Sequence, residues 1–345
     1  METKIFKIQS SDDTQAIAEV AEILKNGGIA AIPTETVYGL AAGAFDVKAV
    51  ENIFIAKGRP QDNPLIVHIA DFDSINELVS SLPDSARILA KKFWPGPLTM
   101  ILPKSDKVPL VVTAGLDTVA VRMPSHPVAA AIIRASGLPL AAPSANLSGK
   151  PSPTNARYVI EDLNGRVDAI ADGGDCSAGV ESTVISLAGD VPRVLRPGVI
   201  TVEQLRSVLG DVIVDKAVLS QPEKGAKVMS PGMKYKHYAP KAKITIINSS
   251  LERYIEYINE NATENTAALC FDGEERLMPL KCVTYGGEND GMAQAHRLFD
   301  ALRELDEIGA QTVFARCPSS DGVGLAVYNR LLRAAAFRVV YLFDE

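Results

Sequence analysis

Two hydrophobic patterns alternate along the first two hundred residues of this 345-residue chain. Short apolar runs bounded by turn residues predict buried strands, and apolar residues three or four positions apart predict helices that bury one face. The strand pattern occurs at residues 28–33, 64–70, 118–121, 138–142, 167–171, 182–187 and 193–195. The helix pattern occurs at residues 46–56, 125–136 and 201–209, with Asp46 as the expected N-cap of the first and Gly137 as the end of the second. Strand–helix units mixed with successive strands favour a mixed α/β sheet over a strictly alternating one.

The last hundred residues repeat the α/β pattern on a smaller scale. Strands are predicted at residues 243–247, 266–271, 283–285, 312–315 and 338–342, and helices at residues 251–261, 292–308 and 325–335. This alternation predicts a small Rossmann-like α/β domain. No GxGxxG follows its first strand, so we expect no dinucleotide site. Because the chain is too long for one average domain, we expect domains at residues 1–215 and 244–345, joined by residues 216–243.

The joining segment differs from an ordinary linker in composition. Residues 224–243 contain six lysines and no acidic residue, which is typical of a solvated basic tether. The segment also contains methionines, prolines, glycines and the two tyrosines Tyr235 and Tyr238. Aromatic residues favour a segment docked on a folded surface, so both interpretations stay open.

The composition is that of a globular protein, with 47% hydrophobic and 22% charged residues. A formal net charge of -7 argues against broad coating of nucleic acid or of an anionic membrane, although it leaves room for a local basic site. The N-terminus lacks the apolar core of a signal peptide, and no run approaches the roughly 20 apolar residues of a membrane span. Four scattered cysteines without a CxxC pair predict reduced thiols and a cytoplasmic location.

Two cations one residue apart, Lys57 and Arg59, follow the helix predicted at residues 46–56. One interpretation is a solvated face that complements the dipole of the helix C-terminus. The other is a phosphate clamp, because arginine offers a planar fork of donors and lysine a point charge. The chain has no GxxxxGK[ST] loop, so phosphate binding here depends on side chains of this kind.

Small polar residues follow two of the predicted strands. Thr34 and Thr36 come after the first strand, and Ser144 and Asn146 come after the strand that ends at Ala142. Ligands of open α/β sheets bind where strands end in loops. The alternatives are a helix start capped by Thr34 and an ordinary polar turn.

His68 and Arg122 are polar residues within apolar strands. A lone histidine in such a strand is more often a satisfied core residue than a ligand. A buried arginine needs an anionic partner, which is either a substrate carboxylate or an internal acid. The four histidines are scattered, so no metal site is expected, and no nucleophile–histidine motif occurs. These features favour catalysis by positioning and charge stabilisation over covalent catalysis.

Taken together, these segments closely resemble the long form of the threonylcarbamoyl-AMP synthases. The family's Lys-x-Arg and Ser-x-Asn signatures occur here as Lys57-Gly-Arg59 and Ser144-Ala-Asn146, and its linker motif occurs at residues 231–240. The resemblance covers essentially the whole chain. It implies an N-terminal YrdC-like domain, with a twisted mixed sheet and a concave active-site cleft, followed by a small C-terminal Rossmann-like domain.

The resemblance also implies the reaction, in which a nucleotidyltransferase forms threonylcarbamoyl-AMP and pyrophosphate from L-threonine, bicarbonate and ATP with Mg²⁺. The product serves a separate transferase that modifies the adenosine beside the anticodon of tRNAs reading ANN codons. By position, the catalytic residues are Lys57 and Arg59. The implied ATP site comprises Arg59, Asn63, Thr118, Ser144, Asn146, Ser152, Arg196 and Tyr235. The implied L-threonine site comprises Thr36, His68, Arg122, Ser182 and the backbone of Ala142.

Two further expectations concern solvent and competing functions. A carbamate loses carbon dioxide and its anhydride hydrolyses, so the site is expected to exclude water, with the segment that carries Tyr235 as a lid. One alternative function is a YrdC-like module that holds double-stranded RNA without chemistry, and weak contact with tRNA or double-stranded RNA stays open. The other is the carbamoyl-transferring relative of hydrogenase maturation, which the lack of cysteine pairs disfavours.

Overall fold

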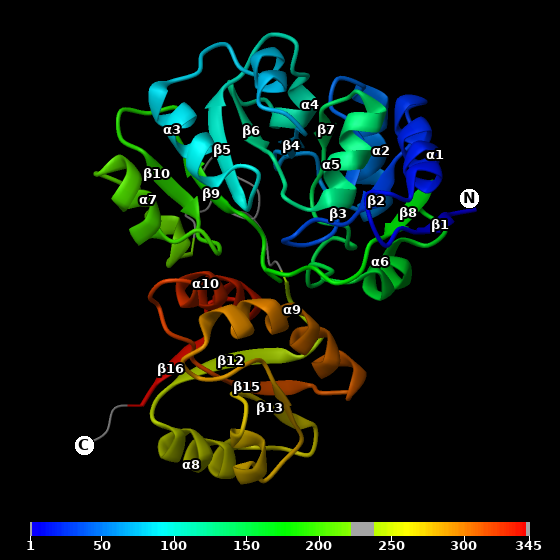
Figure 1. Ribbon diagram of the computed structural model, residues 1–345. Coiled ribbons are helices and arrows are strands. Elements are labelled where there is room, and N and C mark those ends of the chain that lie inside the picture. Colours follow the sequence, from blue (N-terminus) through cyan, green and yellow to red (C-terminus); the bar gives the residue numbers. More distant parts are fainter. Residues whose placement is uncertain (1, 222–237, 343–345) are drawn as a thin grey trace.

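The computed structural model describes residues 2–221 and 238–342, which form two α/β units (Figure 1). The first unit is built on an eleven-stranded sheet in the order β1-β8-β2-β3-β7-β4-β6-β5-β9-β10-β11. Its strands are β1 (Lys4–Lys7), β2 (Ala30–Ile32), β3 (Gly39–Gly43), β4 (Ile66–His68), β5 (Leu98–Pro103), β6 (Thr118–Arg122), β7 (Leu140–Ala141), β8 (Ala169–Asp172), β9 (Thr183–Ser186), β10 (Arg193–Arg196) and β11 (Ile213–Val214). β4 and β6 are parallel, whereas β5 is antiparallel to β6. The predicted mixed sheet is therefore confirmed.

Helices cover this sheet, and two of their ends test the capping predicted from the sequence. They are α1 (Thr14–Lys25), α2 (Val47–Lys57), α3 (Asp84–Phe93), α4 (Leu110–Thr113), α5 (Pro127–Ser136), α6 (Ala156–Leu163) and α7 (Val202–Leu209), with the 3-10 turns η1 (Asp73–Glu77) and η2 (Lys216–Val218). The carboxylate of Asp46 accepts a hydrogen bond from the backbone N–H of Ala49, 3.0 Å away, as an N-cap does. Gly137 ends α5 with a φ of 64°, a left-handed conformation that glycine adopts without strain. Both predicted helix ends are confirmed.

The segment after β2 is a loop and contains no helix. It returns the chain into β3, which pairs antiparallel with β2. The hydroxyl of Thr34 donates to the carbonyl of Val37 at 2.7 Å and accepts from the N–H of Thr36 at 3.1 Å. These bonds close a tight turn, so the alternative of a helix start at Thr34 is wrong.

The second unit is a five-stranded sheet in the order β14-β13-β15-β12-β16. Its elements are β12 (Lys243–Asn248), α8 (Leu251–Asn261), β13 (Thr266–Cys270), η3 (Glu274–Leu277), β14 (Cys282–Thr284), α9 (Gly291–Glu307), β15 (Thr312–Arg316), α10 (Gly324–Ala334) and β16 (Val339–Tyr341). All of its strand pairs are parallel, which confirms the predicted small Rossmann-like layer structure.

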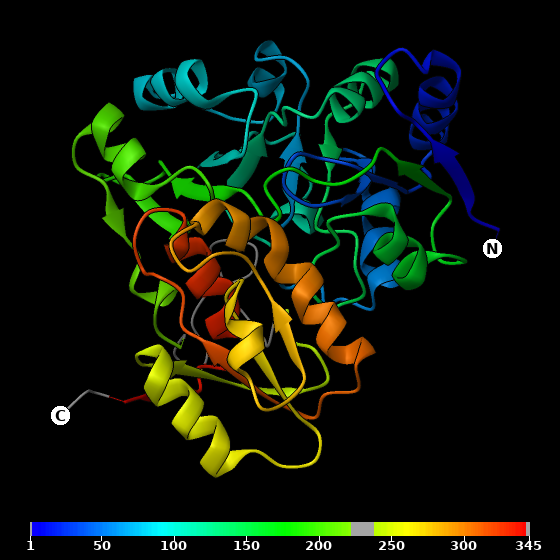
Figure 2. The same cartoon turned by 60° about the horizontal axis from the view of Figure 1, so that its bottom comes forward.

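The helices α9 and α10 lie between this second sheet and the first unit, whereas α8 covers the opposite face (Figures 1 and 2). Val37 and Val180 of the first unit belong to the same hydrophobic cluster as Phe299 of α9 and Val327 of α10. Burial of apolar side chains across the boundary favours a fixed arrangement of the two units.

The predicted boundaries at residues 215 and 243 stay predictions. The segment between them begins with η2 and leads into β12, and its residues 222–237 lie outside the described part of the chain. Tyr235 and residues 231–237 of the linker motif therefore lie outside it as well, whereas residues 238–240 are described. Among the described helices, none is both long enough and apolar enough to cross a bilayer.

Candidate active site

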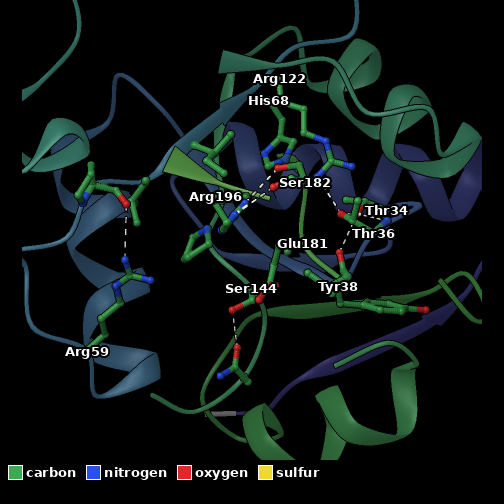
Figure 3. Close-up of a pocket in the computed structure, with 18 of the residues that line it drawn as sticks. Thr34, Thr36, Tyr38, Arg59, His68, Arg122, Ser144, Glu181, Ser182 and Arg196 are labelled. Atoms are coloured by element: carbon green, nitrogen blue, oxygen red, sulfur yellow. Dashed lines mark hydrogen bonds between the residues drawn. The ribbon is translucent and has the colours of Figure 1, made fainter. Parts of the chain in front are cut away.

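One cavity of the first unit gathers the ends of several strands and two loops. The space between its walls, counted out to solvent, is about 660 Å³. Its polar lining consists of Thr34, Thr36, Tyr38, Arg59, His68, Arg122, Ser144, Asn146, Lys150, Glu181, Ser182, Arg196 and Tyr238. Figure 3 shows Arg59 at one side, Thr36 and Arg122 at the other, and Arg196 with Ser182 between them. A concave site with convergent polar groups is the usual form of a small-molecule site.

Arg122 is held at one end of the cavity by the loop after β2. Its Nη1 donates to the hydroxyl of Thr36 at 2.8 Å, and its Nη2 lies 2.8 Å from a carboxylate oxygen of Glu35. Burial favours the neutral form of Glu35, but the charge of Arg122 and hydrogen bonds to the carboxylate together hold the pKa of Glu35 below its ordinary value. The loop therefore supplies both the internal counter-ion and a hydroxyl beside it.

His68 lies beside Arg122, because β4 and β6 are parallel with these two residues paired in register. Burial lowers the pKa of His68 to about 3, and the charge of Arg122 acts in the same direction. The imidazole is therefore neutral near pH 7 and acts through hydrogen bonds. Its Nδ1 is buried and has no partner among the described residues, although the side chain lines the cavity.

Ser182 and Arg196 form the middle of the wall. Arg196 donates from Nε to the carbonyl of Ser182 at 3.0 Å and from Nη2 to its hydroxyl at 3.1 Å. The same hydroxyl lies 2.7 Å from that of Thr99 on β5. Burial lowers the pKa of Arg196 to about 10, so this guanidinium remains charged near pH 7. Its hydrogen-bond partners are neutral oxygens, and the acidic group that acts on its charge is Glu181.

Arg59 stands at the other end of the cavity, just past α2. Gly58 ends the helix with a φ of 59°, which turns the chain sharply toward the cavity. The Nη2 of Arg59 donates to the carbonyl of Asn63 at 3.2 Å, and its buried Nε has no partner within the described part of the chain. Burial lowers its pKa to about 10, which still leaves it cationic near neutral pH.

Lys57, the last residue of α2, lies beneath the turn after β7. Its ammonium donates to the carbonyls of Ser144 and Asn146, the second at 2.5 Å. The hydroxyl of Ser144 in turn donates to the side-chain carbonyl of Asn146 at 2.5 Å. Burial lowers the pKa of Lys57 well below its ordinary value, and the nearby Arg59 charge adds to this effect. Lys57 thus shapes the turn that presents Ser144 and Asn146 to the cavity.

Unpartnered buried polar atoms gather at this cavity. Within residues 2–221 and 238–342, eight residues carry such atoms, and Arg59, His68 and Arg122 line the cavity. Two more, Glu35 and Asn63, contact Arg122 and Arg59. Because buried polar groups are nearly always satisfied, this concentration indicates a site whose bonds are completed by a ligand.

Comparisons with known proteins agree with this site. A family model described as "Telomere recombination" matches residues 22–198, and one described as "Threonylcarbamoyl-AMP synthase, C-terminal domain" matches residues 200–336. The threonylcarbamoyl-AMP synthase of Bacillus subtilis is 47% identical, over 99% of this chain and 100% of that protein. The chain belongs to the threonylcarbamoyl-AMP synthase family.

Two further matches, one to a sequence and one to a solved structure, come from Pyrococcus abyssi. Its threonylcarbamoyl-AMP synthase is 43% identical over 98% of this chain and 99% of that protein. A crystal structure of P. abyssi Sua5 complexed with L-threonine superimposes with a TM-score of 0.90, at 42% identity, and covers 99% of this chain and 100% of that one. The similarity therefore extends through both units.

Most of the residues that the family resemblance implies for the ATP and L-threonine sites meet in the cavity. Eight of them line it: Thr36, Arg59, His68, Arg122, Ala142, Ser144, Ser182 and Arg196. Asn146 lines it as well, beside the turn that Lys57 holds. Their individual roles toward ATP or L-threonine stay predictions.

Other residues of the predicted site lie elsewhere. Lys57 and Asn63 are buried behind the wall, and Ser152 donates to Glu181 at 2.6 Å from behind it. Thr118 lines a separate groove with Arg193 and other residues near β10 and β11. Tyr235 lies outside the described residues, so its contact with ATP stays a prediction.

The sequence analysis did not single out Glu35, Lys150 or Glu181. Glu35 lies between two threonines that were considered, and an acid between Thr34 and Thr36 was a usable signal for a partner of Arg122. Glu181 directly precedes Ser182, but its partner is Arg330, 149 residues away. No local pattern predicts a contact of that separation.

Proposed function

We propose that the protein forms threonylcarbamoyl-AMP and pyrophosphate from L-threonine, bicarbonate and ATP. The observation that carries the proposal is a single cavity with Arg122 at one end and the cations Arg59 and Arg196 farther along it. An amino acid and a triphosphate are both anions, and the cavity offers separate cations to each. The product serves the transferase that modifies the adenosine beside the anticodon of tRNAs reading ANN codons, and we place this activity in the cytoplasm.

The end with Arg122 suits L-threonine. Its guanidinium already sits beside one carboxylate, that of Glu35, and presents the planar fork that recognises a second. The neutral imidazole of His68 and the hydroxyl of Thr36 offer hydrogen-bonding atoms for the side-chain hydroxyl of threonine. We assign Ser182 and the backbone of Ala142 to the same end.

The end with Arg59 suits the triphosphate of ATP. Arg196 is buried and Arg59 is half-buried, both keep their charge, and neither charge is cancelled by the neutral oxygens to which they donate. Buried cations interact with phosphate more strongly than exposed ones, since water screens them less. The turn of Ser144 and Asn146 adds small polar groups between the two ends.

The chemistry explains why the two substrates share one cavity. The threonine amine attacks the carbon of bicarbonate, and loss of water leaves a carbamate. A carbamate oxygen then attacks the α-phosphorus of ATP, and the bond to the β-phosphate oxygen breaks to release pyrophosphate. Because carbamate and phosphate are both anionic, cations at their junction lower the barrier by stabilising the charge that develops there.

Magnesium enters this proposal as part of the nucleotide substrate. Among the described residues, no three His, Cys, Asp or Glu side chains converge on a metal position. Magnesium ordinarily binds substrate phosphates, waters and one or two carboxylates, so a dedicated cage is unnecessary. We infer that the protein binds MgATP through the phosphates rather than through resident metal ligands.

The test is release of pyrophosphate from MgATP by the purified full chain. We expect release to require both L-threonine and bicarbonate, and expect L-valine, which has a methyl group in place of the hydroxyl, to be a poor substitute. Omission of each substrate in turn is the control. Pyrophosphate release that does not depend on L-threonine contradicts the proposal. Retention of double-stranded RNA on a filter, without pyrophosphate release, favours the RNA-binding alternative.

A further inference from the structure

Arg330 of α10 reaches from the second unit into the wall of the active-site cavity. It is fully buried and is the largest fully buried side chain among the described residues. Its Nε donates to a carboxylate oxygen of Glu181 at 2.7 Å, and its Nη1 donates to Asn329 at 2.7 Å. Its Nη2 donates to the carbonyls of Glu181 at 3.3 Å and Pro197 at 3.0 Å. One guanidinium thus joins the second unit to two segments of the first.

These two segments carry cavity residues. Glu181 itself lines the cavity and directly precedes Ser182, and Pro197 directly follows Arg196. Figure 3 shows Glu181 near Ser182 and Arg196 in the middle of the site, between Arg59 and Thr36. Arg330 does not line the cavity, so it acts on a bound ligand only through these neighbours.

Among the described residues that line the cavity, Glu181 is the one that carries a carboxylate. Its other oxygen accepts from Ser152 at 2.6 Å, so the carboxylate is fixed from two sides. Burial favours its neutral form, but the charges of Arg330 and Arg196 outweigh burial and lower its pKa to about 2. Without Arg330, this carboxylate keeps the hydrogen bond from Ser152 but loses the cation that pairs with it, beside the space where an anionic substrate binds.

We propose that Arg330 is a positioning residue of the active site, which neutralises Glu181 and so lets Arg196 bind substrate phosphate. This inference rests on the proposed function, because it takes the ligand to be an anionic nucleotide. It assigns a definite task to the C-terminal unit, which supplies the cation that pairs with Glu181.

A second arginine of this unit supports the same task. Arg303 of α9 donates to the carboxylate of Asp162 at 2.8 Å and to the carbonyl of Pro151 at 2.7 Å. Asp162 also binds Lys150, a residue of the cavity wall, at 2.7 Å. The second unit therefore neutralises two carboxylates directly behind or within the wall, each through one buried arginine.

The experiment compares four variants of the full chain: Arg330→Met, Glu181→Gln, the double variant of both, and Arg316→Met. Arg316 is an equally suited control, because it is a buried arginine of the same unit that pairs with Glu274 at 3.0 Å and does not line the cavity. The readouts are KM for MgATP, kcat, MgATP affinity by calorimetry, and Tm.

We expect Arg330→Met to raise KM for MgATP at least tenfold, and Arg316→Met to change it less than twofold while Tm falls in both. Glu181→Gln removes a negative charge from the cavity wall and should lower KM for MgATP. The double variant should recover most of the affinity lost in Arg330→Met, because no unpaired carboxylate then faces the nucleotide. A merely structural role lowers Tm in both single variants and gives no such recovery.

Equal KM values for Arg330→Met and Arg316→Met overturn the inference, as does a double variant no better than Arg330→Met. If Arg330→Met does not fold, Glu181→Gln decides, since a tenfold rise of its KM for MgATP contradicts the role assigned to Arg330. Failure of the proposed function is distinguishable, because the wild-type chain then releases no pyrophosphate with threonine, whereas MgATP affinity still reports the effect of Arg330.

Discussion

Arg122 lies 2.8 Å from the carboxylate of Glu35, and both side chains are buried. The two groups are close enough for an ion pair, yet their orientation leaves both carboxylate oxygens and the Nη2 of Arg122 without an aligned hydrogen bond. The pair therefore holds in the cavity a charged guanidinium, whose orientation is fixed further by donation from Nε to the carbonyl of Gly96 and from Nη1 to the hydroxyl of Thr36. A substrate carboxylate therefore meets a guanidinium that is already buried, charged and oriented in the folded protein.

This pair predicts that stability and threonine binding can be separated. Arg122→Met leaves the Glu35 carboxylate buried and unpaired, which should lower the free energy of unfolding by about 3–5 kcal/mol. Adding Glu35→Gln removes that charge and should restore much of the stability, but should not restore threonine binding. Urea unfolding and calorimetry with L-threonine measure the two effects. Wild-type threonine affinity in the double variant contradicts the role given to Arg122.

Much of the fold could be predicted from the sequence, because its signals are local. The apolar runs at β2, β4 and β9 and the caps at Asp46 and Gly137 each act within a few residues. The loop after β2 is harder to predict from the sequence, because Thr34 can either cap a helix or close a turn. Pairing of β3 with β2 decides between them, and that pairing depends on residues farther along the chain.

The residues of the site likewise fall into those that local sequence patterns predict and those that depend on distant contacts. The residues at strand ends, such as His68 and Arg122, follow from the rule that loops at strand ends form ligand sites. The partners that set their charge do not follow, since Glu35 was overlooked and Arg330 lies in the other unit. Lys57 was expected at the phosphate, whereas its ammonium binds the carbonyls of a turn 87 residues away. Contacts at such separations depend on the packed fold rather than on a pattern.

The lowered pKa of His68 predicts that the folded protein loses stability in mild acid. Its pKa is about 3 in the folded protein and 6.5 when unperturbed. Below pH 6.5 the unfolded chain therefore binds a proton at this residue that the folded protein does not, so stability falls as the pH drops from about 6.5 toward 3. Between pH 7 and pH 5 this residue alone should cost about 2 kcal/mol. Urea unfolding at the two pH values measures it.

The matched variant is His68→Gln, which keeps a polar side chain and cannot titrate. Its unfolding free energy should fall less between pH 7 and pH 5 than that of the wild type. Some dependence should remain, since burial also lowers the pKa of His126. Identical pH profiles for variant and wild type contradict a neutral, buried His68.

Substitution of Lys57 should mainly lower stability, whereas substitution of Arg59 should mainly weaken binding of MgATP. Lys57→Met leaves the carbonyls of Ser144 and Asn146 without their buried donor, so stability should fall by about 2–4 kcal/mol and activity should fall with it. Arg59→Met should raise KM for MgATP at least tenfold with a smaller loss of stability, because its charge is directed to the ligand. Chemical unfolding and pyrophosphate release distinguish the two. A stable Lys57→Met with near wild-type turnover refutes both the positioning role and the predicted catalytic role of this lysine.

The wall around Arg196 leaves no room for a Cβ at position 198, so we expect substitution of Gly198 by alanine to disturb it. A Cβ at this position would lie 2.4 Å from the backbone nitrogen of Thr183 and 2.9 Å from the carbonyl oxygen of Glu181. Both are backbone atoms of the segment that carries Ser182, so relief of the clash has to move the wall itself. We expect Gly198→Ala to lower stability by about 1–3 kcal/mol, as overpacking typically does, and to raise KM for MgATP.

The control for this clash is Gly189→Ala, in the connection between β9 and β10. A Cβ there meets nothing within 4 Å, so the change should be neutral or slightly stabilising, because alanine restricts the unfolded chain. Thermal unfolding and KM for MgATP, measured side by side for the two variants, test the contrast. If Gly198→Ala behaves like Gly189→Ala in both measurements, the segments of Ser182 and Arg196 are not held as closely against each other as their contacts indicate.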